Sequence, residues 1–314
     1  MIWIIGSGAM AVEYAKVLNA LELEYQCIGR GKASCDKFEA ETGHTVIAGG
    51  IDAFLSSTTQ TATYAIVAVS VEELAKVGSL LVEYGIKKIL LEKPAGLTIN
   101  DIDTLNSKAI DAKCDVFVAY NRRFYESVNQ AKRLIKEDGG VTSLTYEITE
   151  WAHVVKDAHC SVEAKQNWFL ANTTHVIDLA FYLGGKPVQM QSYNSGKLDW
   201  HPSSSNFAGA GITEVGALFS YQGNWNSPGR WSLDVMTKKH RYIFRPMESL
   251  QIQDIGSVST EFVDLTDELD QNFKPGLFLQ TEAFLSDKPN GLCSLSEHIR
   301  HFELYQKMAG YKLD

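Results

Sequence analysis

Over the first 121 residues, short apolar runs alternate with longer stretches in which apolar and polar positions mix. The run at 64–69 is almost continuously apolar, as expected for a strand that is buried on both faces of a sheet. Strands that alternate with helices predict a doubly wound parallel sheet. The expected strands are 1–5, 25–28, 45–47, 64–69, 88–91 and 116–120, and the expected helices include 34–42, 71–84 and 100–112.

From about residue 140 the pattern changes to a series of strand-like stretches with few helices between them. A chain of 314 residues is also longer than one ordinary core needs, which favours two domains. We therefore expect a doubly wound parallel domain at 1–121 and an α+β domain at 122–314 that is dominated by one large, open, antiparallel sheet. Its expected strands are 141–151, 188–193, 213–221, 231–237, 241–244 and 249–253, with helices at 173–183 and 294–308.

The junction between the first strand and the first helix reads Gly6-x-Gly8-x-x-Ala11. In this arrangement Gly6 permits a tight turn, Gly8 lets the backbone approach a pyrophosphate, and Ala11 lets the helix pack closely on the strand. The N–H groups of the helix N-terminus then face the phosphates. The motif alone is weak evidence, but its place at a strand-to-helix junction within a βαβ pattern predicts dinucleotide binding.

Composition narrows the class of protein. The formal charge is −9 and no basic stripe is visible, which argues against a nucleic-acid partner. No apolar stretch approaches the roughly 18 residues of a membrane span, and the N-terminus lacks the basic segment of a signal peptide. The five cysteines show no paired spacing, so we expect free thiols and a cytoplasmic protein. No metal site is expected, because His153, His159 and Cys160 lack a fourth ligand at a recognisable spacing.

The adenosine end of the expected cofactor site lacks the usual acidic residue. NAD-preferring folds place Asp or Glu after the second strand to bind the ribose 2′-hydroxyl. Here Arg30 and Ser34 occupy that region. A guanidinium and a hydroxyl suit a 2′-phosphate, so NADP is slightly favoured over NAD; the alternative is a basic loop that accepts either cofactor.

Three further segments carry a resemblance to a known family. They are Leu91-Glu92-Lys93-Pro94, Tyr120-Asn121-Arg122-Arg123-Phe124 and His175-Val176-Ile177-Asp178. Together with the glycine motif, they resemble the glucose–fructose oxidoreductase / inositol dehydrogenase (Gfo/Idh/MocA) family. The resemblance implies NAD(P)-dependent oxidation or reduction of a sugar, sugar derivative, nucleotide sugar or cyclitol. It also implies a Rossmann domain followed by an open mixed sheet that often mediates oligomerisation. The apolar residues at 212–221 and 231–236 favour a homodimer or homotetramer assembled through that sheet.

Three positions depart from that family's pattern. Ala171 stands four residues before the helix histidine, where many members carry an acid or amide. A Pro-Asn-x-x-His stretch is replaced by residues 70–74, and the acid after the second strand is absent. Two alternatives therefore stay open: a redox-neutral enzyme that cleaves glycosides with bound NAD, and a dinucleotide-binding regulator without catalysis.

The expected catalytic residues follow from position as well as from the resemblance. Lys93 lies at the carboxyl edge of the parallel sheet, where ligands bind in such folds, and can stabilise a developing alkoxide. His175 lies in the first turn of its helix after the capping candidates Asn172 and Thr173, and Asp178 follows on the same face. Expected cofactor contacts are Gly6, Gly8, Ala9, Met10, Arg30, Ser34, Ser70, Glu92, Lys93, Asn121 and Arg122; expected substrate contacts are Lys93, Arg123, Trp151, Trp168, Asn172 and His175.

Tryptophans and histidines outside these motifs have plainer interpretations. Trp151 and Trp168 could stack on a sugar ring, although tryptophan is more often a core residue. His298 and His301, three residues apart in the last expected helix, are predicted to form a solvated face.

Overall fold

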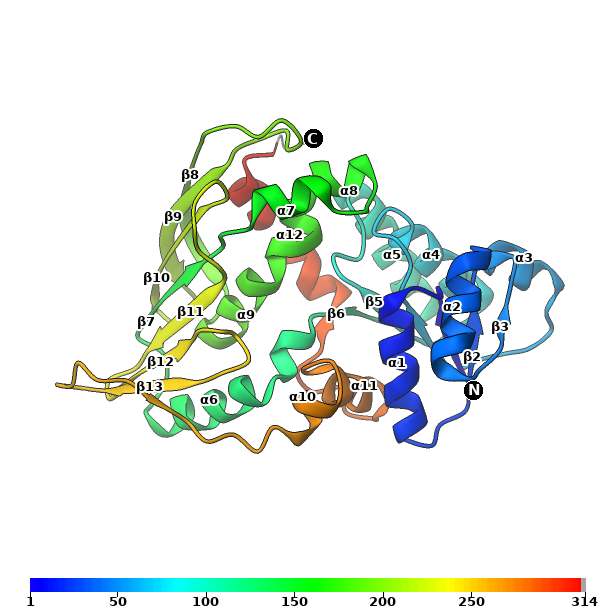
Figure 1. Cartoon of the computed structure of the whole chain (residues 1–314), viewed down its shortest axis with the longest axis horizontal. Coiled ribbons are helices and arrows are strands. Elements are labelled where there is room, and N and C mark those ends of the chain that lie inside the picture. Colours follow the sequence, from blue (N-terminus) through cyan, green and yellow to red (C-terminus); the bar gives the residue numbers. More distant parts are fainter. Residues whose placement is uncertain (312–314) are drawn as a thin grey trace. The chain divides into compact units, whose positions relative to one another are not determined.

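A computed structural model gives the structure of the chain, and it describes residues 1–311. The residues form two compact units (Figure 1). The first comprises Met1–Asn121 and Leu269–Phe302, and the second comprises Arg122–Glu268 and the residues from 303 onward. Residues 269–302, which the sequence analysis assigned to the second domain, belong to the first unit.

The first unit is built on a seven-stranded sheet in the order β15-β6-β5-β4-β1-β2-β3. Strands β1 to β6 are parallel, and only β15 runs antiparallel, beside β6. This order and the near-complete burial of β1 are those of the predicted doubly wound fold. The strands are β1 (Ile2–Ile5), β2 (Tyr25–Ile28), β3 (Val46–Ile47), β4 (Tyr64–Val67), β5 (Lys88–Glu92), β6 (Asp115–Ala119) and β15 (Cys293–Ser294).

Helices cover both faces of this sheet. Figure 1 shows α1 and α2 on the near side and α4 and α5 behind it, and each pair of helices is in contact. The C-terminal segment adds α11, which contacts α1. The helices are α1 (Ala9–Ala20), α2 (Lys32–Thr42), α3 (Gly50–Ser57), α4 (Leu74–Tyr84), α5 (Ile99–Ala112), α10 (Glu268–Asn272), α11 (Leu277–Leu285) and α12 (Leu295–Ala309), which runs from the first unit into the second.

The second unit is built on an eight-stranded sheet in the order β14-β13-β12-β11-β7-β10-β9-β8. Only β7 and β10 pair in parallel, so the sheet is mixed. Helix α9 packs on β7 and β11. Its elements are a 3₁₀ turn (Asn121–Phe124), α6 (Glu126–Glu137), β7 (Ser143–Glu147), α7 (Ala152–Asp157), α8 (Val162–Gln166), a π-helical turn (Phe169–Thr173), α9 (Thr174–Gly184), β8 (Pro187–Ser195), β9 (Asn206–Thr213), β10 (Leu218–Asn224), β11 (Ser232–Met236), β12 (His240–Phe244), β13 (Gln251–Asp254) and β14 (Glu261–Phe262).

Two predictions, one about a strand boundary and one about the exposure of a helix face, are wrong. The single strand expected at 213–221 is instead the end of β9, a turn in which Gly216 has a φ of 82°, and the start of β10. His298 and His301 are buried (0% and 4% exposed) rather than solvated, and His298 Nδ1 lies 3.3 Å from the hydroxyl of Tyr120. Both histidines lie on the buried face of α12, which they share with Leu295, Phe302, Tyr305 and Met308.

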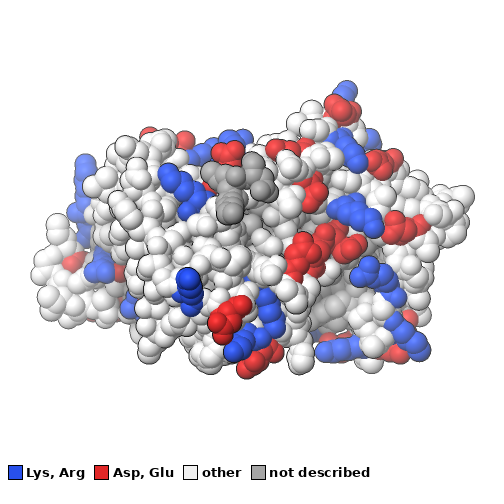
Figure 2. Space-filling view, turned by 90° about the horizontal axis from the view of Figure 1, so that it is seen from above, with Lys and Arg blue, Asp and Glu red and all other residues white. Residues whose placement is uncertain are grey.

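Acidic and basic side chains are interspersed on the face of the molecule shown in Figure 2. That face offers no continuous basic surface. Among residues 1–311, no helix combines the length and the apolar character needed to cross a lipid bilayer.

Candidate functional site

The turn between β1 and α1 can be built only with glycine at its first position. Gly6 has a φ of 107°, and a Cβ there would lie 2.3 Å from the carbonyl oxygen of Ala68. Gly8 is different: it has an ordinary extended backbone, and no described heavy atom would lie within 4 Å of its Cβ. The turn is therefore packed against Ala68 at Gly6, whereas the backbone at Gly8 borders free space.

Helix α1 begins at this open side without a capping side chain. Gly8 is its N-cap residue, no described side chain accepts from the first-turn N–H groups, and that turn holds no acidic residue. Uncapped N–H groups and the positive end of the helix dipole attract anions. The turn thus fits a pyrophosphate, the anionic part of a dinucleotide.

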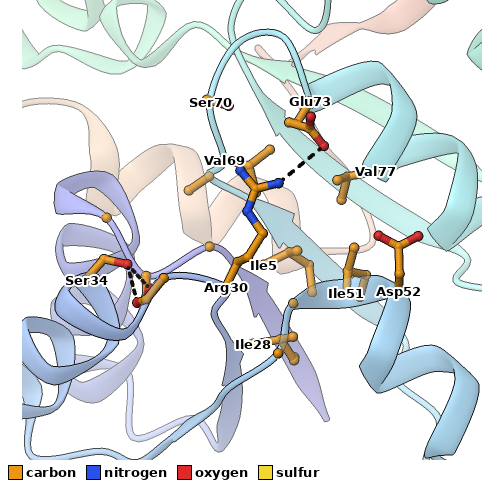
Figure 3. Close-up of a pocket in the computed structure, with 17 residues that line it drawn as sticks. Ile5, Ile28, Arg30, Ser34, Ile51, Asp52, Val69, Ser70, Glu73 and Val77 are labelled. Carbon is orange, nitrogen blue, oxygen red and sulfur yellow. Dashed lines mark hydrogen bonds and ion pairs between the residues drawn. The ribbon is translucent and has the colours of Figure 1, made fainter. Parts of the chain in front are cut away.

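A cavity of about 370 Å³ opens beside this turn (Figure 3). Its walls come from the ends of β1, β2 and β4, the start of α3 and the loop before α4. Since β1 pairs in parallel with both β2 and β4, their carboxyl ends meet at one edge of the sheet. The lining residues are Ile5, Gly6, Ser7, Gly8, Ile28, Arg30, Gly31, Ser34, Gly49, Gly50, Ile51, Asp52, Ala68, Val69, Ser70, Glu73 and Val77.

Five of the expected cofactor residues line this cavity: Gly6, Gly8, Arg30, Ser34 and Ser70. Figure 3 shows Arg30 extending across it toward Glu73, and the two side chains form an ion pair of 3.9 Å. Ser34 lies beside the glycine turn, where its hydroxyl accepts from Ser7 Oγ at 3.0 Å and donates to the carbonyl of Gly31 at 2.9 Å. The guanidinium and the hydroxyl are thus placed in one pocket.

Two carboxylates in this pocket were not considered in the sequence analysis. Asp52 lies in the first turn of α3, and Glu73 immediately precedes α4. Both follow later strands, Asp52 after β3 and Glu73 after β4, whereas the sequence analysis looked for an acid directly after the second strand. The Gly49-Gly50 pair that follows β3, with positive φ at both glycines, is the local signal that could have indicated this wall.

Six other expected cofactor residues do not line the pocket: Ala9, Met10, Glu92, Lys93, Asn121 and Arg122. Asn121 instead donates from its amide to the carbonyl of Pro275 at 2.8 Å. Arg122 lines a different cavity, within the second unit. Cofactor contacts by these six residues stay predictions.

Lys93 directly follows β5, and the residue before it is anchored in the first unit. Glu92 accepts a hydrogen bond of 2.9 Å from the hydroxyl of Tyr14, which in turn lies 3.2 Å from the amide of Gln280. Burial raises the pKa of the Glu92 carboxyl, while the Lys93 ammonium and the Tyr14 hydroxyl act in the opposite direction. Lys93 therefore extends from the end of β5, where the hydrogen bonds of Glu92 and Tyr14 fix the geometry of the strand.

His175 is the second residue of α9, and its side chain is buried (7% exposed) within the second unit. Its ring lies 6.2 Å from that of Trp231. Three residues later, Asp178 binds the guanidinium of Arg123 through both carboxylate oxygens, at 2.8 and 2.6 Å. Because Arg123 and Asp178 are buried and satisfy each other, a structural role of the pair accounts for both; their expected catalytic and substrate roles stay predictions.

The expected capping of α9 by Asn172 or Thr173 is wrong. Neither side chain caps the helix; both donate to Oε1 of Glu150, at 3.0 and 2.9 Å. Glu150 is 1% exposed, and burial raises the pKa of its carboxyl. The sequence analysis did not single out Glu150, because nothing local indicates that residues 22 positions apart share hydrogen bonds.

The two tryptophans expected to contact substrate differ in exposure. Trp151 is 47% exposed, and its indole donates to the carbonyl of Gly229 at 2.9 Å. Trp168 is half-buried at the start of the π-helical turn. Among residues 1–311, no cluster of three His, Cys, Asp or Glu side chains could hold a metal ion.

The chain shares its fold with solved dehydrogenases. Levoglucosan dehydrogenase, solved in complex with NADH, is similar with a TM-score of 0.80 at 15% identity, covering 98% of this chain and 95% of that chain. UDP-N-acetylglucosamine 3-dehydrogenase GnnA from Acidithiobacillus ferrooxidans has a TM-score of 0.77 at 15% identity, covering 98% and 96%. The WlbA dehydrogenase from Chromobacterium violaceum, in complex with NADH and UDP-GlcNAcA, has a TM-score of 0.75 at 16% identity, covering 98% and 92%.

Neither a protein-family model nor a curated protein sequence matches the chain. At this level of identity, the likeness to solved structures establishes the Rossmann sheet and the second mixed sheet. A shared fold does not by itself assign the ligands or the reactions of those dehydrogenases to this chain.

Proposed function

We propose that the chain is an NAD(P)-dependent oxidoreductase of the Gfo/Idh/MocA family. It would transfer a hydride between nicotinamide and a hydroxyl or keto carbon of a sugar, sugar derivative, nucleotide sugar or cyclitol. The observation that carries the proposal is the glycine turn, where Gly6 is sterically required and the uncapped start of α1 borders the cavity. The NADH and nucleotide-sugar complexes of proteins with this fold support it.

In this proposal each residue at the reacting carbon has a separate task. Bound nicotinamide supplies the hydride acceptor or donor. The Nζ atom of Lys93 donates a hydrogen bond to the reacting oxygen and stabilises negative charge that develops there. A ring nitrogen of His175 accepts the hydroxyl proton in the oxidation direction. Asp178, held by Arg123, acts as a positioning residue for the turn of α9 that carries His175.

Cofactor preference is proposed from the same cavity. Arg30 and Ser34 suit a 2′-phosphate, which favours NADP, although Glu73 competes for the guanidinium. Asp52 is a carboxylate that suits a ribose hydroxyl and would favour NAD. The slight preference for NADP therefore rests on Arg30 leaving Glu73 when a phosphate is present.

The remaining proposals concern the protein's surroundings. A cytoplasmic location is proposed from the cysteines, of which Cys27, Cys35 and Cys114 are buried free thiols. Trp151, Trp168 and Asn172 are proposed to contact the sugar-like substrate. A homodimer or homotetramer assembled through the second sheet is proposed as well, and its test is argued in the Discussion.

Nicotinamide absorbance, recorded with NAD and NADP against a panel of sugars, sugar acids and nucleotide sugars, tests the function. With a substrate found, Lys93→Ala and His175→Ala should each lower kcat by about 10²-fold or more. NADH binding, measured by calorimetry, should survive in both variants. Lys87→Ala, an exposed lysine one residue before β5, is the matched control and should keep wild-type turnover.

Wild-type turnover by Lys93→Ala would remove the proposed mechanism. If the two residues serve one proton transfer, the double variant should be little worse than either single variant. Product formed without net reduction of the cofactor would instead indicate the redox-neutral alternative.

A further inference from the structure

The second unit contains a cavity of about 400 Å³ that the proposed mechanism does not use. It lies between the end of β7, the segment that leads into β11 and the segment that follows β12. A volume of this size suits a small organic ligand. Three arginines share its wall with two carboxylates and an apolar surface: Arg122, Glu147, Gly229, Arg230, Trp231, Arg245, Pro246, Met247 and Glu248.

Two of the arginines are held by stacking on aromatic faces. The guanidinium carbons of Arg122 and Arg230 lie 4.8 and 4.7 Å from the ring centre of Trp231. Arg230 also lies 5.0 Å from the ring centre of Trp151. Stacking fixes the plane of a guanidinium while its N–H groups, which lie in that plane, stay available for hydrogen bonds.

Arg122 is the least compensated of these charges. Its Nε atom is buried and has no hydrogen-bond partner among residues 1–311, and no described carboxylate lies within ion-pair distance. Burial lowers the pKa of its guanidinium, although an arginine this basic keeps its charge. Its sequence neighbour Arg123 is buried, but has both oxygens of Asp178 as partners. Arg122 as a whole is half-buried, but its Nε atom is buried without a hydrogen-bond partner, and Glu248 and Glu150 act on its charge only from beyond ion-pair distance. An anion that enters the cavity would compensate this charge directly.

The other two arginines differ in what they already bind. Arg230 donates to Oε2 of Glu150 at 3.2 Å, and Arg245 donates to the hydroxyl of Ser232 at 2.9 Å, a neutral partner. Glu147 and Glu248 add negative charge to the wall. Arg122 and Arg245 therefore remain able to bind an anion, whereas the carboxylates would disfavour one placed beside them.

We propose that this cavity binds the anionic group, a carboxylate or a phosphate, of a sugar-like substrate. The guanidinium of Arg122, stacked on Trp231, donates to two oxygens of the anion, and Arg245, which lines the same cavity, donates to it as well. The ring of Trp231 and the side chain of Met247 contact the carbon skeleton. The proposal rests on the proposed function for the identity of the ligand as a substrate, and it narrows that substrate to an acidic one.

Calorimetry with the full chain tests the site without requiring turnover. The probes share one ring: D-glucose, D-glucuronate, which adds a carboxylate, and D-glucose 6-phosphate, which adds a phosphate. At least one anionic probe should bind at least 10-fold more tightly than D-glucose, and the stronger of the two identifies the source of the anion. Arg122→Gln should weaken that probe by about 10-fold or more, as expected for lost charge-assisted hydrogen bonds.

Two further variants make the result specific. Arg133→Gln, an exposed arginine on α6 that pairs with Glu126, should bind the probes like the wild type. Arg245→Gln removes an exposed arginine of the wall, so it reports on the site even if Arg122→Gln fails to fold. Because Arg122 lines this cavity, the proposal replaces its expected cofactor contact with a substrate contact, and NADH binding should be unchanged in all three variants.

Equal binding of all three probes to the wild type would overturn the proposal. So would wild-type affinity in both Arg122→Gln and Arg245→Gln, or an equal loss of NADH binding, which would assign Arg122 to the cofactor. Anion binding that depends on Arg122 in a protein without nicotinamide turnover would keep this site and remove the proposed function. Turnover of a neutral sugar at an unchanged kcat/KM in Arg122→Gln would keep the proposed oxidoreductase function and remove this anion site.

Discussion

At the scale of single residues, the two motif glycines are constrained for opposite reasons. Gly6 is fixed by the protein itself, because its positive φ and its contact with Ala68 exclude any side chain. Gly8 has an allowed backbone and free space around it, so the folded protein alone gives no reason for glycine there. A ligand that approaches the backbone would give that reason.

The two glycines should therefore separate stability from binding. Gly6→Ala should lower the free energy of unfolding by about 3 kcal/mol or more, since the added Cβ meets backbone and the residue is held at positive φ. Gly8→Val should melt close to the wild-type temperature but lose NAD and NADP binding, because its side chain would fill the space that a pyrophosphate needs. Urea unfolding and calorimetry measure the two effects. Unchanged cofactor affinity in a folded Gly8→Val would contradict the dinucleotide assignment.

The sequence predicts the role of a residue well where that role depends on its neighbours in the chain. The tight turn at Gly6 follows from the motif, as does the placement of Arg30 and Ser34 in one pocket. Such prediction fails where partners are distant in the chain. Thr173 was expected to cap its own helix but donates to Glu150, and the carboxylate of Asp178 is occupied by Arg123, 55 residues away.

At the scale of elements, strands that are buried on both faces were predicted well. β4, for example, lies within the expected run at 64–69. Strands with one exposed face were harder, because β9 and β10 carry small and polar residues whose pattern continues across the turn between them. The long connection between β8 and β9 gave no periodic signal at all, yet it contains a buried histidine.

His201 holds that connection against the core of the second unit. Its Nδ1 donates to the carbonyl of Ser204 at 3.1 Å, its Nε2 lies 2.8 Å from the hydroxyl of Tyr311, and its ring packs on Trp225 and Phe207. Burial lowers the pKa of the ring to about 4. Between pH 6.5 and about 4, the unfolded chain binds a proton at this histidine and the folded chain does not, so stability falls as the pH falls.

Acidification should therefore affect the wild type more than His201→Phe, which keeps an aromatic ring but cannot titrate. Between pH 7 and pH 5, urea unfolding should show a loss from this residue of about 2 kcal/mol in the wild type and none in the variant. His153→Gln, which removes an exposed histidine, should follow the wild-type pH dependence. Parallel curves for wild type and His201→Phe would show that the ring does not resist protonation.

At the scale of the whole molecule, the sequence pattern favours two units, but it does not indicate that the chain returns to the first unit after the second sheet. Residues 269–302 follow the second sheet in the chain and belong to the first unit, where β15 pairs with β6 and α11 contacts α1. The pairing of Cys293 with Val118, 175 positions apart, leaves no periodic trace in either segment. The lining residues Asp52 and Glu73 were missed for a related reason, because a pocket collects loops that only the folded sheet brings together.

Assembly is the remaining prediction at this scale, and it depends on the edge of the second sheet. Strands β8, β9 and β10 carry no charged residue, and β8 is an edge strand. Their outward residues include Tyr193 (71% exposed) and Leu218 (61% exposed), with Ala208 and Ala210 between them. Soluble proteins usually place charges on exposed edges, so an uncharged one is expected to meet another copy of the chain.

Light scattering at micromolar concentration should give a dimer or tetramer mass. Leu218→Glu should shift that mass toward the monomer, whereas Ile110→Glu, at a residue of α5 with 64% exposure, should not. A monomer mass for the wild type would show that this face is solvated in the native protein.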